Sequence, residues 1–406
     1  MTNSETKNFS QNVSSSYHLE DRNKNIPKLR FKGYNDEWKK IKLGEHLNIC
    51  RGASPRPIEK YITVENNGVN WIKIGDISPN ENVIKCTKEK ITIEGAKHSR
   101  YVRKGDLILS NSMSFGRPYI LEIDGCIHDG WLLIQDLEKL FDKKYLCYLL
   151  DSDTVKQQYR KYAAGGVVIN LNSELVRSVK VYMPNFHEQE KIASFLTLID
   201  KKIEKQKELV ELLKKYKRGL LSSIFSQNLR FKDNDGNDYP TWEEKRLEEI
   251  LKIKHGKSQK EIECTNGKYP ILATGGEIGR TNSCLWNKPC VLIGRKGTID
   301  KPQYMETPFW TVDTLFYSEV FKDNNAKYLY YLFNTINWKK YDESTGVPSL
   351  SAKTIGRIKV TLSISNTEQT IISKILSKFD NKIQQEECIL SNLQTYKKGL
   401  LQQMFI

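Results

Sequence analysis

The sequence contains one long pattern of residues twice, and this repeat constrains the fold more than any other feature. The pair Glu188-Gln189 recurs as Glu368-Gln369, and every later match keeps the same offset of 180 residues without a gap. A chain of 406 residues also exceeds the ~250–300 residues at which a single hydrophobic core stops growing. Because the repeated unit is far longer than a solenoid repeat, we interpret it as a duplicated domain. The further matches are Leu196 with Leu376, Asp200 with Asp380, Lys202-Ile203 with Lys382-Ile383, Tyr216-Lys217-Arg218-Gly219-Leu220-Leu221 with Tyr396-Lys397-Lys398-Gly399-Leu400-Leu401, and Phe225 with Phe405.

The beginnings of the two copies also match, whereas their middles match only weakly. Leu29-Arg30-Phe31 recurs as Leu229-Arg230-Phe231, and residues 166–181 resemble residues 346–360. Each copy therefore consists of a variable globular part followed by a well-matched helical part. We predict a disordered leader at 1–26, a globular domain at 27–184, a long helix at 185–227, a second globular domain at 228–364 and a second long helix at 365–406.

The well-matched parts are expected to form two long helices. Residues 187–227 contain no proline and only one glycine, and their apolar residues recur at steps of four and three, the coiled-coil period. Each helix would be roughly 60 Å long at 1.5 Å per residue, and its apolar stripe must be buried. The helices could simply hold the fold together. The obvious partner of each stripe, however, is the stripe of the other helix. We therefore expect an antiparallel pair with a pseudo-twofold axis and a central contact between Gln206 and Glu386. The predicted pairing residues are Ile192, Leu196, Ile199, Ile203, Gln206, Val210 and Leu213 in one helix, and Ile372, Leu376, Phe379, Ile383, Glu386, Leu390 and Leu393 in the other.

The globular parts are predicted to be α+β with a substantial β-sheet. Short apolar or alternating runs are bounded by Gly, Pro, Asn and Asp, which is typical of strands joined by turns. Helices are expected at 144–162 and 326–341. The clearest strand candidates are 69–74, 106–109, 131–134, 291–293 and 314–317.

The net charge of +15 indicates a polyanionic partner, which could be nucleic acid, an acidic protein or an anionic membrane. Several loops place basic, hydroxyl and amide side chains beside glycine. Arg and Lys can donate to guanine or phosphate, Asn and Gln suit adenine, and glycine lets the backbone approach a phosphate. Any one such loop could be an ordinary polar turn, but similar loops occur in both copies. The candidate DNA-binding residues are Arg51, Ser54, Arg56, Ser110, Asn111, Ser112, Ser114, Arg117, Lys257, Ser258, Gln259, Lys260, Thr274, Arg280, Arg295, Lys296 and Thr298.

Motifs for chemistry are missing, so no catalytic residue is assigned. No G-x-x-x-x-G-K-[ST] loop occurs, and no two prolines are adjacent, which excludes the Asn/Asp-Pro-Pro-aromatic motif of adenine methyltransferases. Glu37-Trp38-Lys39 and Glu243-Glu244-Lys245 fit half of a nuclease site but lack a convincing upstream Asp. No spacing of Ser, His and Asp suggests a triad.

Metal, membrane and export signals are missing as well. The eight cysteines form no C-x-x-C pair, so we expect free thiols in a reducing cytosol and no metal site. No apolar run approaches the ~18–20 residues of a membrane helix, and the first 25 residues lack the pattern of a secretory signal.

Taken together, the duplicated Leu-Arg-Phe…Trp…Leu beginning, the Glu-Gln pair and the Tyr-Lys-(Lys/Arg)-Gly-Leu-Leu helix ends resemble the DNA specificity subunit of type I restriction–modification systems. The likeness covers about residues 27–406, essentially the whole chain. It implies that each globular part is a target-recognition domain reading one half of a bipartite double-stranded DNA site, and that the helices set the spacer.

The resemblance also implies which partners carry out the chemistry. Two methyltransferase subunits would dock on this chain and bind S-adenosylmethionine, and two restriction subunits would bind ATP and Mg²⁺, so the chain itself would need no cofactor. Two alternatives remain: a coiled-coil scaffold with basic domains for acidic partners, and a single-chain enzyme that joins recognition to modification or cleavage.

Overall fold

The computed structural model describes residues 13–15, 25–76, 82–111, 116–163 and 171–406. The chain divides into two compact units. The first unit comprises Met1–Lys205 together with Leu390–Ile406, and the second comprises Gln206–Ile389. Each unit therefore contains one globular part and a segment of each long helix.

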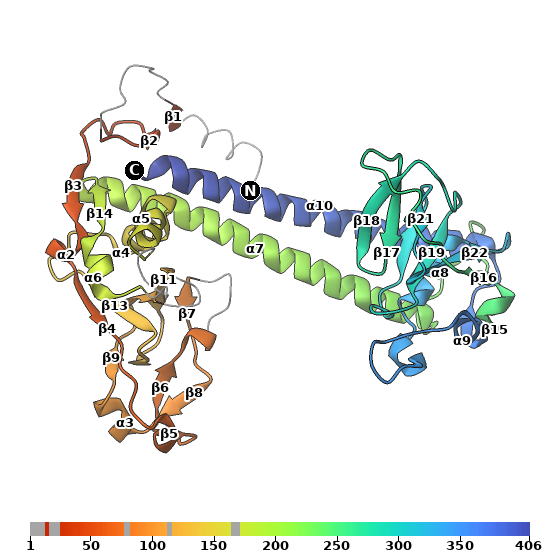
Figure 1. Cartoon of the computed structure of the whole chain (residues 1–406), viewed down its shortest axis with the longest axis horizontal. Helices are drawn as coiled ribbons and strands as arrows, with labels where there is room; N and C mark the ends of the chain where they lie inside the picture. The colour runs from red at the N-terminus through yellow and green to blue at the C-terminus, as the bar shows by residue number, and fades with distance from the viewer. Residues whose placement is uncertain (1–12, 16–24, 77–81, 112–115, 164–170) are drawn as a thin grey trace. The chain divides into compact units, whose positions relative to one another are not determined.

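The first unit is built on two five-stranded sheets (Figure 1). In strand order these are β4-β13-β10-β11-β7 and β5-β8-β6-β12-β9, antiparallel except for the pairs β11–β7 and β12–β6. The central strands β10 and β13 are short apolar runs whose residues are almost all buried, as expected of strands covered on both faces. The bounds are β4 Asn48–Arg51, β5 Ile62–Thr63, β6 Val69–Ile72, β7 Val83–Ile84, β8 Glu89–Ile91, β9 Arg100–Val102, β10 Leu107–Ser110, β11 Pro118–Leu121, β12 Gly125–Ile127 and β13 Trp131–Gln135.

Helices cover the first of these sheets. The apolar residues of α4 belong to one core with Leu107, Leu109 and Leu132 of the sheet, and Ile192 and Leu196 of α7 (Phe186–Phe225) join the same core. Two small ribbons complete the unit, β14 with β3 and β1 with β2. The bounds are β1 Val13–Ser15, β2 Leu29–Phe31, β3 Lys39–Lys42, β14 Lys180–Met183, α2 Leu43–His46, α3 Ile93–Lys97, α4 Lys143–Asp151, α5 Asp153–Ala163 and α6 Ser173–Ser178, with 3-10 turns η1 Ile58–Lys60 and η2 Ile74–Asp76.

The second unit repeats this plan with fewer strands. Its main sheet has the order β16-β22-β19-β20, which corresponds to β4-β13-β10-β11, and its smaller sheet has the order β18-β17-β21. A ribbon of β15 and β23 corresponds to β3 and β14. The bounds are β15 Glu243–Arg246, β16 Leu251–Lys254, β17 Tyr269–Ala273, β18 Gly276–Thr281, β19 Cys290–Gly294, β20 Gln303–Met305, β21 Trp310–Thr311, β22 Leu315–Val320, β23 Lys359–Leu362, α8 Ala326–Phe333 and α9 Ala352–Arg357, with 3-10 turns η3 Leu247–Glu249 and η4 Trp338–Tyr341.

Three expectations about local structure need correction. The helix expected at 144–162 is two helices, because Ser152 takes an extended conformation after α4 and its hydroxyl accepts a hydrogen bond from Val155 N at the start of α5. The helix expected at 326–341 ends at Phe333, and only η4 follows. In the leader expected at 1–26, residues Val13–Ser15 form a strand paired with β2, while residues 1–12 and 16–24 lie outside the described residues.

The two long helices are α7, Phe186–Phe225, and α10, Asn366–Met404. In the second unit Gln206 donates to Glu386 O at 3.1 Å, and the ring centroids of Tyr216 and Phe379 lie 5.3 Å apart. Since higher numbers in α7 meet lower numbers in α10, the paired segments run in opposite directions, as predicted. The other predicted pairing residues, Ile192, Leu196, Ile199, Ile203, Val210, Leu213, Ile372, Leu376, Ile383, Leu390 and Leu393, are buried or half-buried.

The apolar stripes do not pack only on each other, however. In the first unit Leu400, Met404 and Phe405 belong to the globular core, as do Ile192 and Leu196. In the second unit Ile224 belongs to a core that also contains Ile372 and Leu376. Each globular part is therefore stabilised by its own helix and by the end of the other one.

The same polar cluster holds the helices in each unit. In the first unit Tyr148 OH donates to Asp200 at 2.7 Å, and Lys397 Nζ lies 2.6 Å from the other carboxylate oxygen. In the second unit Tyr331 OH donates to Asp380 at 2.6 Å, and Lys217 forms the matching ion pair. The 180-residue repeat is thus a repeat of helix contacts.

Candidate nucleic-acid interface

Three loops meet at one end of the main sheet in the first unit. Strand β13 runs antiparallel to both β4 and β10, so the start of β13 lies beside the ends of its two neighbours. Gly52 N donates to Trp131 O at 2.8 Å, and Asn111 N donates to Gly130 O at 3.0 Å. The loops that follow β4 and β10 are therefore fixed against the loop that precedes β13.

Asp129 is the centre of this loop cluster. Its carboxylate accepts from Ser54 Oγ at 2.9 Å and lies 3.4 Å from an Arg56 nitrogen, while its carbonyl accepts from Arg51 Nε at 2.9 Å. Partial burial acts to raise the pKa of Asp129, but the hydrogen bonds from Ser54 and the backbone and the charges of His128 and Arg51 outweigh it, so the pKa is lowered. The two arginine side chains remain 62% and 80% exposed. Asp129 thus orients two arginines whose guanidinium groups still reach solvent.

The other predicted residues of the first unit differ in accessibility. Ser110 and Asn111 are buried, and Asn111 Nδ2 donates to Asp129 O at 2.8 Å, so both stabilise the loop rather than form its surface. Arg117 is half-buried, with its guanidinium 3.0 Å from Asn82 Oδ1 and 5.4 Å from the Tyr119 ring centroid. Ser112 and Ser114 lie outside the described residues.

The second unit brings equivalent loops together at the same end of its sheet. Lys257 N donates to Thr311 O and Arg295 N donates to Thr314 O, both at 2.8 Å. Asp313 occupies the position of Asp129 before the central strand, and its carboxylate lies 3.5 Å from Arg295. A basic residue is thus held by an aspartate of the equivalent loop in both units.

The remaining predicted residues lie on these loops or on the neighbouring hairpin. Lys257, Ser258, Lys260 and Lys296 are exposed, and Gln259, Thr274 and Thr298 are half-buried. Thr274 lies beside the loop of Lys296, since its side chain is among the nearest atoms to a Cβ placed at Gly294 or Gly297. Arg280 is on β18, where its guanidinium bonds Gly267 O at 2.9 Å and pairs with Glu277 at 3.5 Å. Arg280 is therefore the predicted residue of this unit most engaged by its own hairpin.

Sequence reasoning missed Asp129 and Asp313. Each aspartate lies just before a predicted strand, at 131–134 or at 314–317. The two aspartates are 184 residues apart, the same offset that relates Ser110 to Gly294, and this correspondence could have identified them. Both residues are acidic like DNA itself, and here they orient basic side chains.

A glycine in the loop after the first strand of each main sheet, Gly52 or Gly256, makes the loop packing possible. A Cβ at Gly256 would lie 2.0 Å from Val312 O, whereas nothing lies within 4 Å of a Cβ at Gly275. We expect Gly256→Ala to destabilise the second unit by about 1–3 kcal/mol, because the backbone must move to relieve the overlap. Denaturant unfolding would measure this loss, with Gly275→Ala as the control. Equal stability of the two variants would contradict the packing described here.

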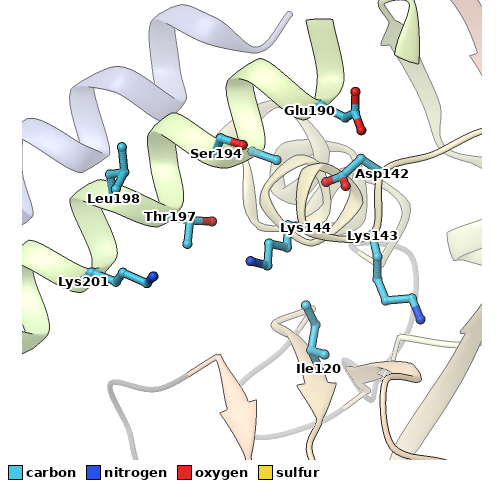
Figure 2. A pocket seen from close by; sticks show the side chains of 10 residues that line it. Ile120, Asp142, Lys143, Lys144, Glu190, Ser194, Thr197, Leu198 and Lys201 are labelled. Atoms are coloured by element: carbon cyan, nitrogen blue, oxygen red, sulfur yellow. The ribbon is translucent and has the colours of Figure 1, made fainter. Parts of the chain in front are cut away.

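Two of the pockets formed by the described residues lie in the first unit. One, of about 770 Å³, adjoins the loop cluster and is lined by Ser54, Arg56, Trp71 and His128, among others. The other, of about 570 Å³, lies between the start of α4 and α7 and is lined by Asp142, Lys143, Lys144, Glu190 and Lys201, among others (Figure 2). Because no predicted DNA-binding residue lines this second pocket, we place the interface at the loops.

Two other kinds of site have no counterpart among the described residues. No group of three or more His, Cys, Asp or Glu side chains there could hold a metal ion. No helix among them has the length and apolarity to cross a bilayer.

Comparisons with known proteins agree with this geometry. The family model of the type I restriction modification DNA specificity domain matches residues 35–214 and again 239–395. The chain is 26% identical over 250 residues to the type I restriction enzyme MjaIX specificity subunit of Methanocaldococcus jannaschii, covering 58% of this chain and 57% of that protein. It is 25% identical over 287 residues to a putative type I specificity subunit of Mycoplasma genitalium, covering 67% of this chain and 73% of that protein. The aligned part thus spans little more than half of the first relative.

A solved structure has the same fold. The crystal structure of a type I restriction–modification S subunit from M. genitalium superposes with a TM-score of 0.62 at 20% sequence identity, covering 94% of this chain and 99% of that one.

Proposed function

The chain belongs to the type I restriction modification DNA specificity domain family, and from this premise we propose that it is the DNA-recognition subunit of such a system and performs no chemistry itself. Each unit reads one half of a bipartite double-stranded DNA site. The observation that carries the proposal is the cluster of three loops in each unit, which presents basic side chains held by Asp129 or Asp313 at the equivalent end of its sheet.

The proposal includes partners and their cofactors. Two methyltransferase subunits dock on the helices and bind S-adenosylmethionine, and two restriction subunits bind ATP and Mg²⁺. The duplicated Tyr–Asp–Lys clusters support two equal docking places, because they hold the helices by the same contacts in each unit. The assembly acts on DNA in the cytoplasm.

Salt-sensitive and sequence-selective binding to duplex DNA is the direct test. We expect the chain alone to bind random-sequence duplexes with an affinity that falls steeply with salt, since each phosphate contact releases a counterion. Selection of duplexes by the chain with its methyltransferase should yield two fixed half-sequences around an unspecified spacer. Sequence-indifferent binding by the assembly would favour a basic scaffold for acidic partners instead. Methyl transfer by the isolated chain would favour a single-chain enzyme.

The helices are proposed to set the spacer. Four residues inserted into α7, with four inserted at the equivalent place in α10, add about 6 Å at 1.5 Å per residue, close to two base pairs at 3.4 Å each. We expect the selected spacer to lengthen while both half-sequences stay the same. The same duplex selection measures it, and an unchanged spacer would contradict the ruler role.

A further inference from the structure

A loop of the second unit that none of the basic candidates occupies has the properties of a reading element. It comprises residues 344–349, between η4 and α9. The Asp342 carboxylate accepts from Ser344 N at 3.0 Å and from Ser349 N at 2.9 Å, so it closes the loop at both ends. Glu343 N also donates to Ser349 O at 3.0 Å. The conformation of the loop is therefore fixed by its hydrogen bonds with Asp342 and Glu343, the two residues that precede it.

This 344–349 loop is joined to the basic loop that follows β19. Gly297 N donates to Pro348 O at 2.8 Å, and Leu350 N donates to Arg295 O at 2.9 Å. Lys296 and Ser349 form a β-bridge. The first unit contains the same link, since Leu171 N donates to Asn111 O at 2.9 Å. Whatever surface Arg295 and Lys296 contact, the 344–349 loop lies at its edge.

The tip of the loop is uncharged and carries an exposed apolar side chain. Val347 is 67% exposed. The neighbouring carboxylate of Glu343 accepts hydrogen bonds from Ser351 and Thr354, and so is directed toward the start of α9. No acidic side chain of the 344–349 loop therefore opposes the approach of DNA, and the Val347 side chain can make only apolar contacts.

We propose that Val347 reads the 5-methyl group of a thymine in the major groove of the half-site bound by the second unit. The inference rests on the proposed function and adds a specificity-determining residue to it. The thymine methyl is the apolar feature of the major-groove edge, and apolar side chains recognise it. Basic residues on the adjoining loop supply phosphate or guanine contacts, so the two loops together distinguish more base pairs than charge alone.

Replacing thymine with uracil tests the contact, because uracil lacks only the methyl group. The full chain with its methyltransferase is titrated against duplexes carrying uracil at each thymine of the selected site in turn. At one position of one half-site we expect the wild-type protein to bind the thymine duplex about fourfold more tightly, the value of one buried methyl-sized group. Val347→Ala should reduce that ratio to about one while binding to the other half-site is unchanged.

Val64→Ala is the matched control, because Val64 is 99% exposed in the first unit. It should leave the thymine-to-uracil ratio at the Val347-dependent position unaltered. A wild-type protein that selects its site yet shows no uracil-sensitive position, or a ratio that survives Val347→Ala, would overturn the inference while leaving the proposed function in place. A wild-type assembly without any sequence selectivity would instead refute the proposed function.

Discussion

Arg30→Met is expected to destabilise the first unit by about 3–5 kcal/mol, because it leaves a buried carboxylate without its partner. Arg30 donates to Glu188 through two nitrogens, at 2.7 and 2.8 Å, and the two side chains are 9% and 1% exposed. Methionine fills much of the same space but cannot donate to Glu188. Hydrogen exchange followed by mass spectrometry would report the loss as faster exchange throughout the core of the first unit.

The equivalent pair in the second unit provides a matched comparison. Arg230 is 28% exposed, and Glu368 also accepts from Trp242 Nε1 at 2.9 Å and from Ser363 Oγ at 2.6 Å. Arg230→Met should therefore cost less than Arg30→Met, since two donors remain and the arginine is already partly hydrated. Restored stability in the double variant Arg30→Met/Glu188→Leu would support the charge argument. Equal losses in the two single variants would contradict it.

Charge reversal at Lys296 or Arg295 should impair recognition of one half-site by about 10- to 100-fold while leaving assembly with the methyltransferase intact. Lys296 is exposed on the loop after β19, so glutamate there repels the phosphate backbone directly. Arg295→Glu would in addition face Asp313, 3.5 Å from the present guanidinium, so it should also disturb the loop. Binding to duplexes in which only one half-site is randomised would separate the two halves.

Lys322→Glu is the control for this experiment. Lys322 is exposed in the same unit, just beyond Val320, where β22 ends, whereas Asp313 precedes the start of β22. Lys322→Glu changes the net charge as much as Lys296→Glu does, but Lys322 lies at the end of β22 away from Asp313. If Lys322→Glu weakened the same half-site as strongly as Lys296→Glu, overall charge rather than the loop would explain the effect. If Lys296→Glu prevented assembly with the methyltransferase but left DNA recognition intact, the DNA-binding site would have to lie elsewhere.

The long helices could be predicted closely from the sequence. Their bounds, Phe186–Phe225 and Asn366–Met404, lie within a few residues of the predicted ranges, and Gln206 meets Glu386 as expected. Helix formation and coiled-coil pairing depend on residues three and four positions apart, so a linear pattern contains the necessary information. The split at Ser152 was missed because its cap depends on one hydroxyl rather than on periodicity.

The candidate interface could be predicted only in part. The sequence indicated basic residues beside glycine. Arg51 and Arg56 do lie at one end of the main sheet of the first unit, and Arg295 and Lys296 lie at the equivalent end in the second unit. From the sequence alone, Ser110 could not be distinguished from exposed candidates of the same chemistry such as Ser258, yet Ser110 is buried in β10.

The order of residues alone determined the duplication, the two amphipathic helices and the positive charge, because each is a property of composition or of spacing along the chain. Only the tertiary structure decided that Asp129 and Asp313 hold the basic loops and that the 344–349 loop adjoins Arg295. The contacts of the two aspartates arise from the strand orders β4-β13-β10 and β16-β22-β19, which place β4 beside β13 and β16 beside β22 although these strands are far apart in the sequence. Such pairing is selected by the packing of the whole sheet, and no local pattern encodes it.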